Sequence, residues 1–111
     1  MIAEFTGQAP VEQLITGAAP AWILKHSATC PTSAAALAEV EAYLAAHPGE
    51  AAGLVVVQRD RPLSNWIATR LGRVHQSPQL FLVHAGTVAW SASHWSITAA
   101  AMAEHRAGLP A

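Results

Sequence analysis

The sequence contains very little cysteine: Cys30 is the only one among 111 residues. A single thiol cannot form an intrachain disulfide, so the chain is not one of the small folds held together by disulfides. Zinc and iron–sulfur sites use several thiolates, which excludes a cysteine-based metal cluster within one chain. Any chemistry at Cys30 is therefore the chemistry of one thiol.

Charged residues are also scarce, at 12% of the chain, and the formal net charge is −1. Such a chain lacks the basic patch that binds nucleic acid or anionic lipid. It also lacks a run of about 20 apolar residues, so we expect no membrane span. The first residues, Met1 to Phe5, do not have the basic start and apolar run of a signal peptide. We therefore expect a cytoplasmic protein.

Hydrophobic residues, in contrast, make up 52% of the sequence. This content excludes an intrinsically disordered chain. It is enough for a core, because a domain of this size buries roughly 60–65% of its unfolded surface. No internal repeat or linker interrupts the sequence, and we expect residues 1–111 to form one domain.

The first two thirds of the chain alternate between helical and strand patterns. Apolar residues at helical spacing predict helices, and short β-branched runs predict buried strands. Proline suits the first turn of a helix, and glycine suits its end. The expected elements are a helix over 9–17, a strand over 21–24, a helix from 31 to the Pro48-Gly49 stop, a strand over 53–58 and a helix from about 60 to 72.

The last third of the chain has a different pattern. Strands over 79–84 and 87–91 flank Ala85-Gly86, and two strands joined by a tight glycine turn form an antiparallel hairpin. A last helix is expected from about Ser96 to Ala107. Two parallel βα units followed by a hairpin predict an α/β fold with a mixed four-stranded sheet and helices on both faces. This is the layout of a thioredoxin-like fold.

Cys30 lies at the end of the first strand-to-helix loop, one residue before Pro31. Reactive sites in α/β sheets gather at the carboxyl ends of strands, and a helix N-terminus offers unpaired N–H groups. These groups favour a thiolate by about 1–2 kcal/mol, or about one pKa unit. The position predicts a redox thiol whose thiolate is supported by Thr29, Pro31 and Ser33. The alternative is a structural cysteine that is buried as a small apolar residue.

Two serines mark this expected site. Ser33 stands three residues after Cys30, where dithiol oxidoreductases carry a resolving cysteine. Its hydroxyl can only form hydrogen bonds, either to the Cys30 sulfur or to the helix N-terminus. Ser77-Pro78 precedes the third strand, where thioredoxin-like domains carry a cis proline beside the redox cysteine. A cis bond turns the Ser77 backbone toward an incoming thiol, and a trans proline at a strand start is the alternative.

Three motifs in this order resemble the monothiol bacilliredoxin family, the small thioredoxin-like proteins of the bacillithiol system. They are Lys25-His26-Ser27-Ala28-Thr29-Cys30-Pro31-Thr32-Ser33, then His75-Gln76-Ser77-Pro78-Gln79, then Ser93-His94-Trp95-Ser96-Ile97-Thr98. The resemblance covers nearly the whole chain and is weakest over residues 1–20.

The resemblance implies a thiol-disulfide oxidoreductase that removes bacillithiol from protein mixed disulfides. In this family the thiolate attacks the mixed disulfide, takes the small thiol onto itself and releases the protein thiol. A second low-molecular-weight thiol then regenerates the enzyme. In this chain the nucleophile can only be Cys30. Bacillithiol is thus the expected co-substrate, without a tightly bound cofactor, and bacillithiolated proteins are the expected partners of a monomer.

Bacillithiol carries a malate with two carboxylates, which attract cationic side chains. Lys25, at the exit of the strand that feeds the reactive loop, is the candidate in the best position, ahead of Arg70 and Arg73. A solvated charge at a strand end is the other interpretation of Lys25. His26 and His75 flank the expected site in two loops, and either can donate a hydrogen bond near the thiolate.

The segment between the last strand and the last helix is the remaining candidate for substrate binding. In glutaredoxin-like folds this junction faces the thiol ligand, so Trp95 can form a wall of the pocket and His94 can contact the ligand. Ser93 or Ser96 can cap the helix and leave N–H groups for an anion. Alternatively, Trp95 closes the core and His94 is a surface residue.

Two other functions are compatible with these residues. The first is a monothiol glutaredoxin that uses glutathione. Its cluster-binding members carry Cys-Gly-Phe-Ser, whereas this chain has Pro31 and Thr32 in place of Gly and Phe. The second is a non-catalytic thioredoxin-like adaptor, in which Cys30 reacts no faster than a free thiol. Hydrolase, phosphate-loop and dinucleotide-binding motifs are absent from the sequence.

Overall fold

The computed structural model describes residues 2–110, so Met1 and Ala111, at the two ends of the expected domain, lie outside the described residues. In chain order the elements are α1 (Gln8–Thr16), β1 (Ala21–His26), α2 (Pro31–Ala46), β2 (Ala51–Val56), α3 (Arg61–Leu71), β3 (Gln79–His84), β4 (Thr87–Ser93), the 3-10 helix η1 (His94–Ser96) and α4 (Ala99–Ala107). The predicted order of helices and strands is confirmed, with η1 added.

The four strands form one mixed sheet in the order β2-β1-β3-β4. Strands β1 and β2 run parallel, and both the β1–β3 and the β3–β4 pairs are antiparallel. The β3–β4 turn consists of Ala85 and Gly86, with φ angles of 52° and 86°. A two-residue hairpin turn requires this left-handed backbone at both positions. The predicted combination of a parallel pair with a C-terminal hairpin is confirmed.

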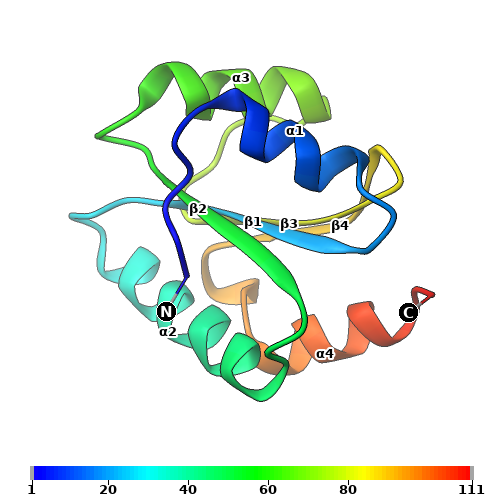
Figure 1. Cartoon of the computed structure of the whole chain (residues 1–111). Helices are drawn as coiled ribbons and strands as arrows, with labels where there is room; N and C mark the ends of the chain where they lie inside the picture. Colours follow the sequence, from blue (N-terminus) through cyan, green and yellow to red (C-terminus); the bar gives the residue numbers. More distant parts are fainter. Residues whose placement is uncertain (1, 111) are drawn as a thin grey trace.

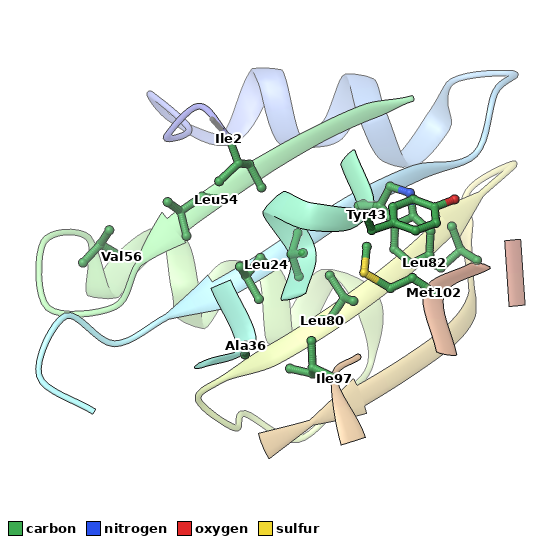
Figure 2. Close-up of a cluster of buried hydrophobic side chains, with 12 residues drawn as sticks. Ile2, Leu24, Ala36, Tyr43, Leu54, Val56, Leu80, Leu82, Ile97 and Met102 are labelled. Atoms are coloured by element: carbon green, nitrogen blue, oxygen red, sulfur yellow. The ribbon is translucent and has the colours of Figure 1, made fainter. Parts of the chain in front are cut away.

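Helices cover both faces of the sheet, as the sequence predicts: α1 and α3 lie on one side, and α2 and α4 lie on the other (Figure 1). Successive residues of a strand point to opposite faces, so β1 and β3 each supply both layers. On the α2/α4 side, Trp22, Leu24, Leu80 and Leu82 pack with Val40, Tyr43, Ile97 and Met102 (Figure 2). On the α1/α3 side, Ile23 and Phe81 pack with Val11, Ile15, Leu63 and Ile67.

The segment before α1 covers the outer edge of β2. The backbone N–H of Leu54 donates to the carbonyl of Ala3 at 2.9 Å, and the N–H of Phe5 donates to the carbonyl of Leu54 at 2.7 Å. The Phe5 ring lies against Gly53, in the space that the Cβ of any other residue would occupy. The glycine in this strand is therefore explained by close packing.

Three strand boundaries differ from the prediction. Strand β1 continues to His26, because Lys25 pairs with both Val55 and Gln79. Strand β2 spans 51–56, two residues earlier than predicted, and β4 continues to Ser93, which pairs with Gln79. Residues at the ends of these strands belong to them because of backbone pairing, which the hydrophobic pattern of the sequence does not report.

The last helix begins later than predicted. Residues His94 to Ser96 form the separate 3-10 helix η1, and α4 begins at Ala99. Thr98 caps α4, since its side-chain oxygen accepts a hydrogen bond from the backbone N–H of Ala101 at 3.1 Å. The expectation that Ser93 or Ser96 caps this helix is therefore wrong. Within residues 2–110, no helix is both long and apolar enough to span a bilayer.

Candidate functional site

One end of the sheet gathers most of the residues that the sequence analysis singles out. Strands β1 and β2 finish at this end, and because β3 is antiparallel to β1, β3 begins there and β4 finishes there. The loops that contain Cys30, Pro78 and His94 therefore lie at the same edge (Figure 1). We call this end of the sheet, where β1 and β2 finish, the Cys30 end. The carboxyl ends of parallel strands are the usual place for binding sites in α/β folds.

Cys30 is the N-cap residue of α2, with Pro31 in the first turn, and its carbonyl accepts a hydrogen bond from Ala34 N–H at 3.1 Å. Its side chain is partly exposed and the thiol makes no capping hydrogen bond. The pKa of this thiol lies below its ordinary value, chiefly because the backbone N–H of Ser33 favours the thiolate. Partial burial raises the pKa, whereas the N–H of Thr32 and the hydroxyls of Thr32 and Ser33 lower it. These are the features of a reactive thiol.

Ser33 is fully buried and belongs to the site instead of capping the helix. Its hydroxyl oxygen accepts a hydrogen bond from the backbone N–H of Ser27 at 3.2 Å, and its own proton remains available to the Cys30 sulfur. Thr29 is exposed, and its hydroxyl accepts a hydrogen bond from Gln58. The structure therefore places Thr29 in the loop before Cys30 and Ser33 in the first turn of α2, on either side of the thiol in the sequence.

The loop before β3 is held by hydrogen bonds of its own. The Ser77–Pro78 peptide bond is cis. The carbonyl of Pro78 accepts a hydrogen bond from His94 N–H at 3.2 Å, which joins this loop to the segment after β4. The Ser77 hydroxyl oxygen is buried and has no hydrogen-bond partner among residues 2–110. The buried side chain of Gln79 donates to the carbonyl of Val74 and accepts from Gln76 N–H, each at 3.0 Å.

Lys25 differs from the expectation of a charge at the strand exit, because its side chain has no exposed surface. Its Nζ lies 3.0 Å from His75 Nδ1. Burial lowers the pKa of Lys25 to about 8, so the amine is still mostly protonated at pH 7. An ammonium group has no lone pair, so His75 Nδ1 accepts this hydrogen bond and the ring proton of neutral His75 lies on Nε2. Lys25 can therefore act on a ligand only through the exposed ring of His75.

The remaining cationic candidates separate into paired and unpaired groups. Arg70 forms a two-pronged ion pair with Glu12, with both N–O distances at 2.8 Å, so its charge is already used between α3 and α1. Arg73 is exposed and has no carboxylate partner among residues 2–110. His26 is the last residue of β1 and not a loop residue, and its pKa is lowered chiefly by burial.

His94 and Trp95 are both exposed at the end of β4. Trp95 is 73% exposed, so the interpretation that it closes the core is wrong. A cavity of about 220 Å³ lies between this segment and α2, lined by Ala35, Glu39, His94, Trp95 and their neighbours. His94 has a φ of 54°, an uncommon conformation for a residue with a side chain. Backbone of this kind is concentrated at functional sites.

Two residues of the site had no role assigned from the sequence: Gln58, which contacts the Cys30 loop, and Gln79, which holds the loop before Pro78. Gln79 belongs to the second of the three motifs, but its hydrogen bonds within the turn were not predicted. Gln58 lies outside the motifs and acts on a loop in another part of the chain. Among residues 2–110 there is no group of three or more His, Cys, Asp or Glu side chains that could hold a metal ion.

Comparison with solved structures supports the fold. A candidate oxidoreductase with a thioredoxin fold is 30% identical, with a TM-score of 0.87 over 94% of this chain and 92% of the other. Mitochondrial thioredoxin 3 from Saccharomyces cerevisiae, in its oxidized form, has a TM-score of 0.76 at 14% identity over 97% and 95% of the two chains. Fasciola hepatica thioredoxin has a TM-score of 0.77 at 15% identity over 96% and 98%. The predicted thioredoxin-like fold is confirmed.

Comparison with protein families agrees with the site. The family model described as monothiol bacilliredoxin BrxC matches residues 4–102, which include Cys30, Pro78 and Trp95. This match covers most of the chain, and the structure places a single partly exposed thiol at a helix N-terminus, with a serine where a second thiol would stand. The chain belongs to the monothiol bacilliredoxin family.

Proposed function

We propose that this protein removes bacillithiol from protein mixed disulfides by monothiol exchange at Cys30. The observation that carries the proposal is the position of Cys30 at the N-cap of α2, where the N–H groups of Ser33 and Thr32 lower the pKa of the thiol. A thiol with a lowered pKa has more thiolate at neutral pH, and the thiolate is the nucleophile in disulfide exchange. Membership of a bacilliredoxin family supports bacillithiol as the small thiol.

The reaction has two exchange steps. In the first, the Cys30 thiolate attacks the bacillithiol sulfur of the mixed disulfide. A disulfide forms between Cys30 and bacillithiol, and the protein sulfur leaves with the electron pair and takes up a proton. In the second, the thiolate of a free low-molecular-weight thiol attacks the bacillithiol sulfur. This step forms a small-molecule disulfide and returns Cys30 as a thiolate.

Ser33 explains why the proposal needs an external thiol. In a dithiol enzyme the residue at this position attacks the mixed disulfide from within the same chain. A hydroxyl cannot do so, and Ser33 instead binds the Ser27 N–H and favours the Cys30 thiolate. The proposed enzyme therefore uses bacillithiol as a co-substrate and needs no tightly bound cofactor. One chain supplies the whole proposed site, and we propose that the active form is a monomer.

The proposed substrate contacts surround Cys30. The exposed ring of His75 presents its Nε2–H to solvent with the buried Lys25 ammonium behind it, an arrangement that favours a carboxylate such as those of malate. The Ser77 and Pro78 backbone would meet the incoming disulfide. Trp95 offers an exposed apolar surface for the sugar, with His94 beside it. Bacillithiolated proteins of a bacterial cytoplasm are the proposed partners.

Intact-mass spectrometry tests the proposal directly. The reduced protein and a Cys30→Ser control are mixed with oxidised bacillithiol or oxidised glutathione at pH 7, and the adduct is followed over time. We expect a rapid adduct with bacillithiol in the native protein only. An adduct with glutathione alone would assign the protein to the glutathione-dependent alternative. Labelling no faster than that of free cysteine would leave a thioredoxin-like adaptor with a structural thiol.

A second variant examines the role of Ser33. Replacing Ser33 by Cys places a thiol where dithiol enzymes carry the resolving residue. We expect the bacillithiol adduct of Ser33→Cys to be short-lived, because the second thiol displaces bacillithiol and forms an internal disulfide. An adduct as persistent as that of the native protein would show that position 33 cannot reach the Cys30 sulfur.

A further inference from the structure

Gln58 lies just beyond β2, beside the loop that leads to Cys30. The backbone N–H of Val57 donates to the carbonyl of His26 at 2.9 Å, so the pairing of β2 with β1 continues past the last strand residue. The next residue, Gln58, therefore lies beside the point where β1 ends and the loop to Cys30 begins. Gln58 is an exposed residue, and its side-chain amide contacts the neighbouring loop.

The Gln58 amide contacts three consecutive residues of that loop. Its Nε2 donates to Ser27 Oγ at 2.6 Å and to Thr29 Oγ1 at 3.3 Å. Its Oε1 accepts from the backbone N–H of Ala28 at 3.1 Å. Both ends of the amide are therefore occupied by residues 27–29, which immediately precede the reactive cysteine.

The loop also closes on itself and on α2. Cys30 N–H donates to the carbonyl of Ser27 at 3.4 Å, and Ser27 N–H donates to Ser33 Oγ at 3.2 Å. These contacts join the loop to the helix that it enters. Gln58 adds a side-chain link from the loop to the segment that follows β2.

We propose that Gln58 is a positioning residue for the thiol reaction. By holding residues 27–29, it keeps Cys30 at the N-cap of α2, where the Ser33 and Thr32 N–H groups favour the thiolate. Gln58 does not touch the sulfur, and it acts only through the loop. This inference rests on the proposed function, because it assigns Gln58 a role in the reactivity of Cys30.

The test uses a small neutral alkylating agent, iodoacetamide, so that the readout does not depend on bacillithiol. The rate of Cys30 alkylation is measured against pH in the native protein, in Gln58→Met and in Gln58→Glu. Methionine has a similar length without hydrogen-bonding groups, whereas glutamate keeps the acceptor for Ala28 N–H and loses both donors. Gln13→Met, an exposed glutamine of α1, is the matched control. Circular dichroism confirms that each variant is folded.

We expect the pH midpoint of alkylation to rise by roughly 0.5 to 1 unit in Gln58→Met, as the loss of about one net hydrogen bond implies. At pH values below the native midpoint the rate should fall roughly three- to tenfold, with no change in Gln13→Met. The effect of Gln58→Met should shrink when Ser27→Ala already removes one partner, because the two residues act through the same contact.

A native-like midpoint and rate in both Gln58 variants would overturn the positioning role. That outcome differs from failure of the proposed function, in which the native protein itself would show the midpoint of a free thiol. A higher midpoint with an undiminished effect in the Ser27→Ala background would also contradict the inference, because Gln58 would then act by another route.

Discussion

The two ends of the sheet treat their polar groups in different ways. At the end where β1 and β2 begin, Glu50 accepts hydrogen bonds from Trp22 Nε1 at 2.7 Å and from the Tyr43 hydroxyl at 2.9 Å. Arg106 adds an ion pair with Glu50 at 3.5 Å, although its Nε has no hydrogen-bond partner among residues 2–110. Burial and the neighbouring Glu50 raise the pKa of Tyr43 above its ordinary value, so its proton stays in place.

At the Cys30 end, one buried charge and one buried hydroxyl lack such partners. The buried Lys25 ammonium has only the neutral ring of His75, and no salt bridge to it exists among residues 2–110. The Ser77 hydroxyl is also buried and has no hydrogen-bond partner among residues 2–110. Satisfied polar groups stabilise a fold, whereas unsatisfied ones cost stability and are common where a ligand supplies the missing partner. We therefore expect the Glu50 group to contribute mainly to stability and the Cys30 end to contribute mainly to the proposed reaction.

The largest effect should come from the Glu50 end. Glu50→Ala leaves the donors of Trp22 and Tyr43 without an acceptor and removes the carboxylate beside Arg106, and we expect a loss of about 3–5 kcal/mol in the free energy of unfolding. Glu50→Gln keeps one acceptor oxygen and should lose less. Urea titration measures both, while the alkylation rate of Cys30 in the folded protein should not change. A loss below about 1 kcal/mol for Glu50→Ala would show that this end is not a stabilising network.

Lys25 should give the opposite result. Its folded pKa of about 8 lies below the ordinary 10.5, so between these values the unfolded chain binds more protons and stability rises with pH. Below pH 8 the cost of the buried charge is fully present. Lys25→Met should therefore stabilise the protein at pH 7 by about 2–3 kcal/mol. The difference should vanish by pH 10.5. A destabilised variant at pH 7 would mean that the ammonium is well compensated in the fold.

Each end also contains one residue other than glycine with a positive φ: Ala85 in the β3–β4 turn, at 52°, and His94 at the Cys30 end, at 54°. Glycine relieves this strain but is more flexible in the unfolded chain. On balance, Ala85→Gly and His94→Gly should each raise the free energy of unfolding by about 0.5–1 kcal/mol. Thermal unfolding measures the gain. Only His94→Gly should alter thiol exchange, and an equal change in both variants would remove the distinction between the ends.

The smallest effect concerns the thiolate itself. The pKa of Cys30 is lowered, so its alkylation should continue to a lower pH than that of a free thiol. Thr32→Val removes one hydroxyl but keeps the backbone N–H groups, and the midpoint of alkylation should rise by less than about one pH unit. Thr69→Val, on the exposed side of α3, is the control. A shift larger than that would make the Thr32 hydroxyl, and not the helix N-terminus, the main cause.

The order of the elements can be predicted from the sequence because each depends on local signals. Proline at position 31, glycine at position 72 and the apolar run over 79–84 mark a start, an end and a strand without reference to distant residues. Cys30 is placed at the helix N-terminus by the same local reasoning, since Pro31 favours the first helical turn.

The environment of the site depends on contacts between distant residues, and these are not visible in a single sequence. Lys25 looks like a charge at a strand end until β1 is seen to pair on both sides and His75 is seen to cover it. Trp95 looks like a core residue because of its size, but a 3-10 turn directs it to solvent. Gln58 has no local signal at all, because its role depends on the loop of another strand.

The covering of β2 by residues 3–5 has a consequence for how copies of this protein can meet. A sheet edge with free N–H and C=O groups can pair with the edge of another molecule, and two open edges allow a growing fibre. Here Ala3 and Phe5 occupy the backbone of Leu54 on one edge, and within residues 2–110 strand β4 pairs only with β3 on the other. Light scattering at high protein concentration measures whether copies of the protein form dimers or larger assemblies. Backbone pairing between copies is therefore expected through β4, where it would close a dimer, and not through the covered part of β2.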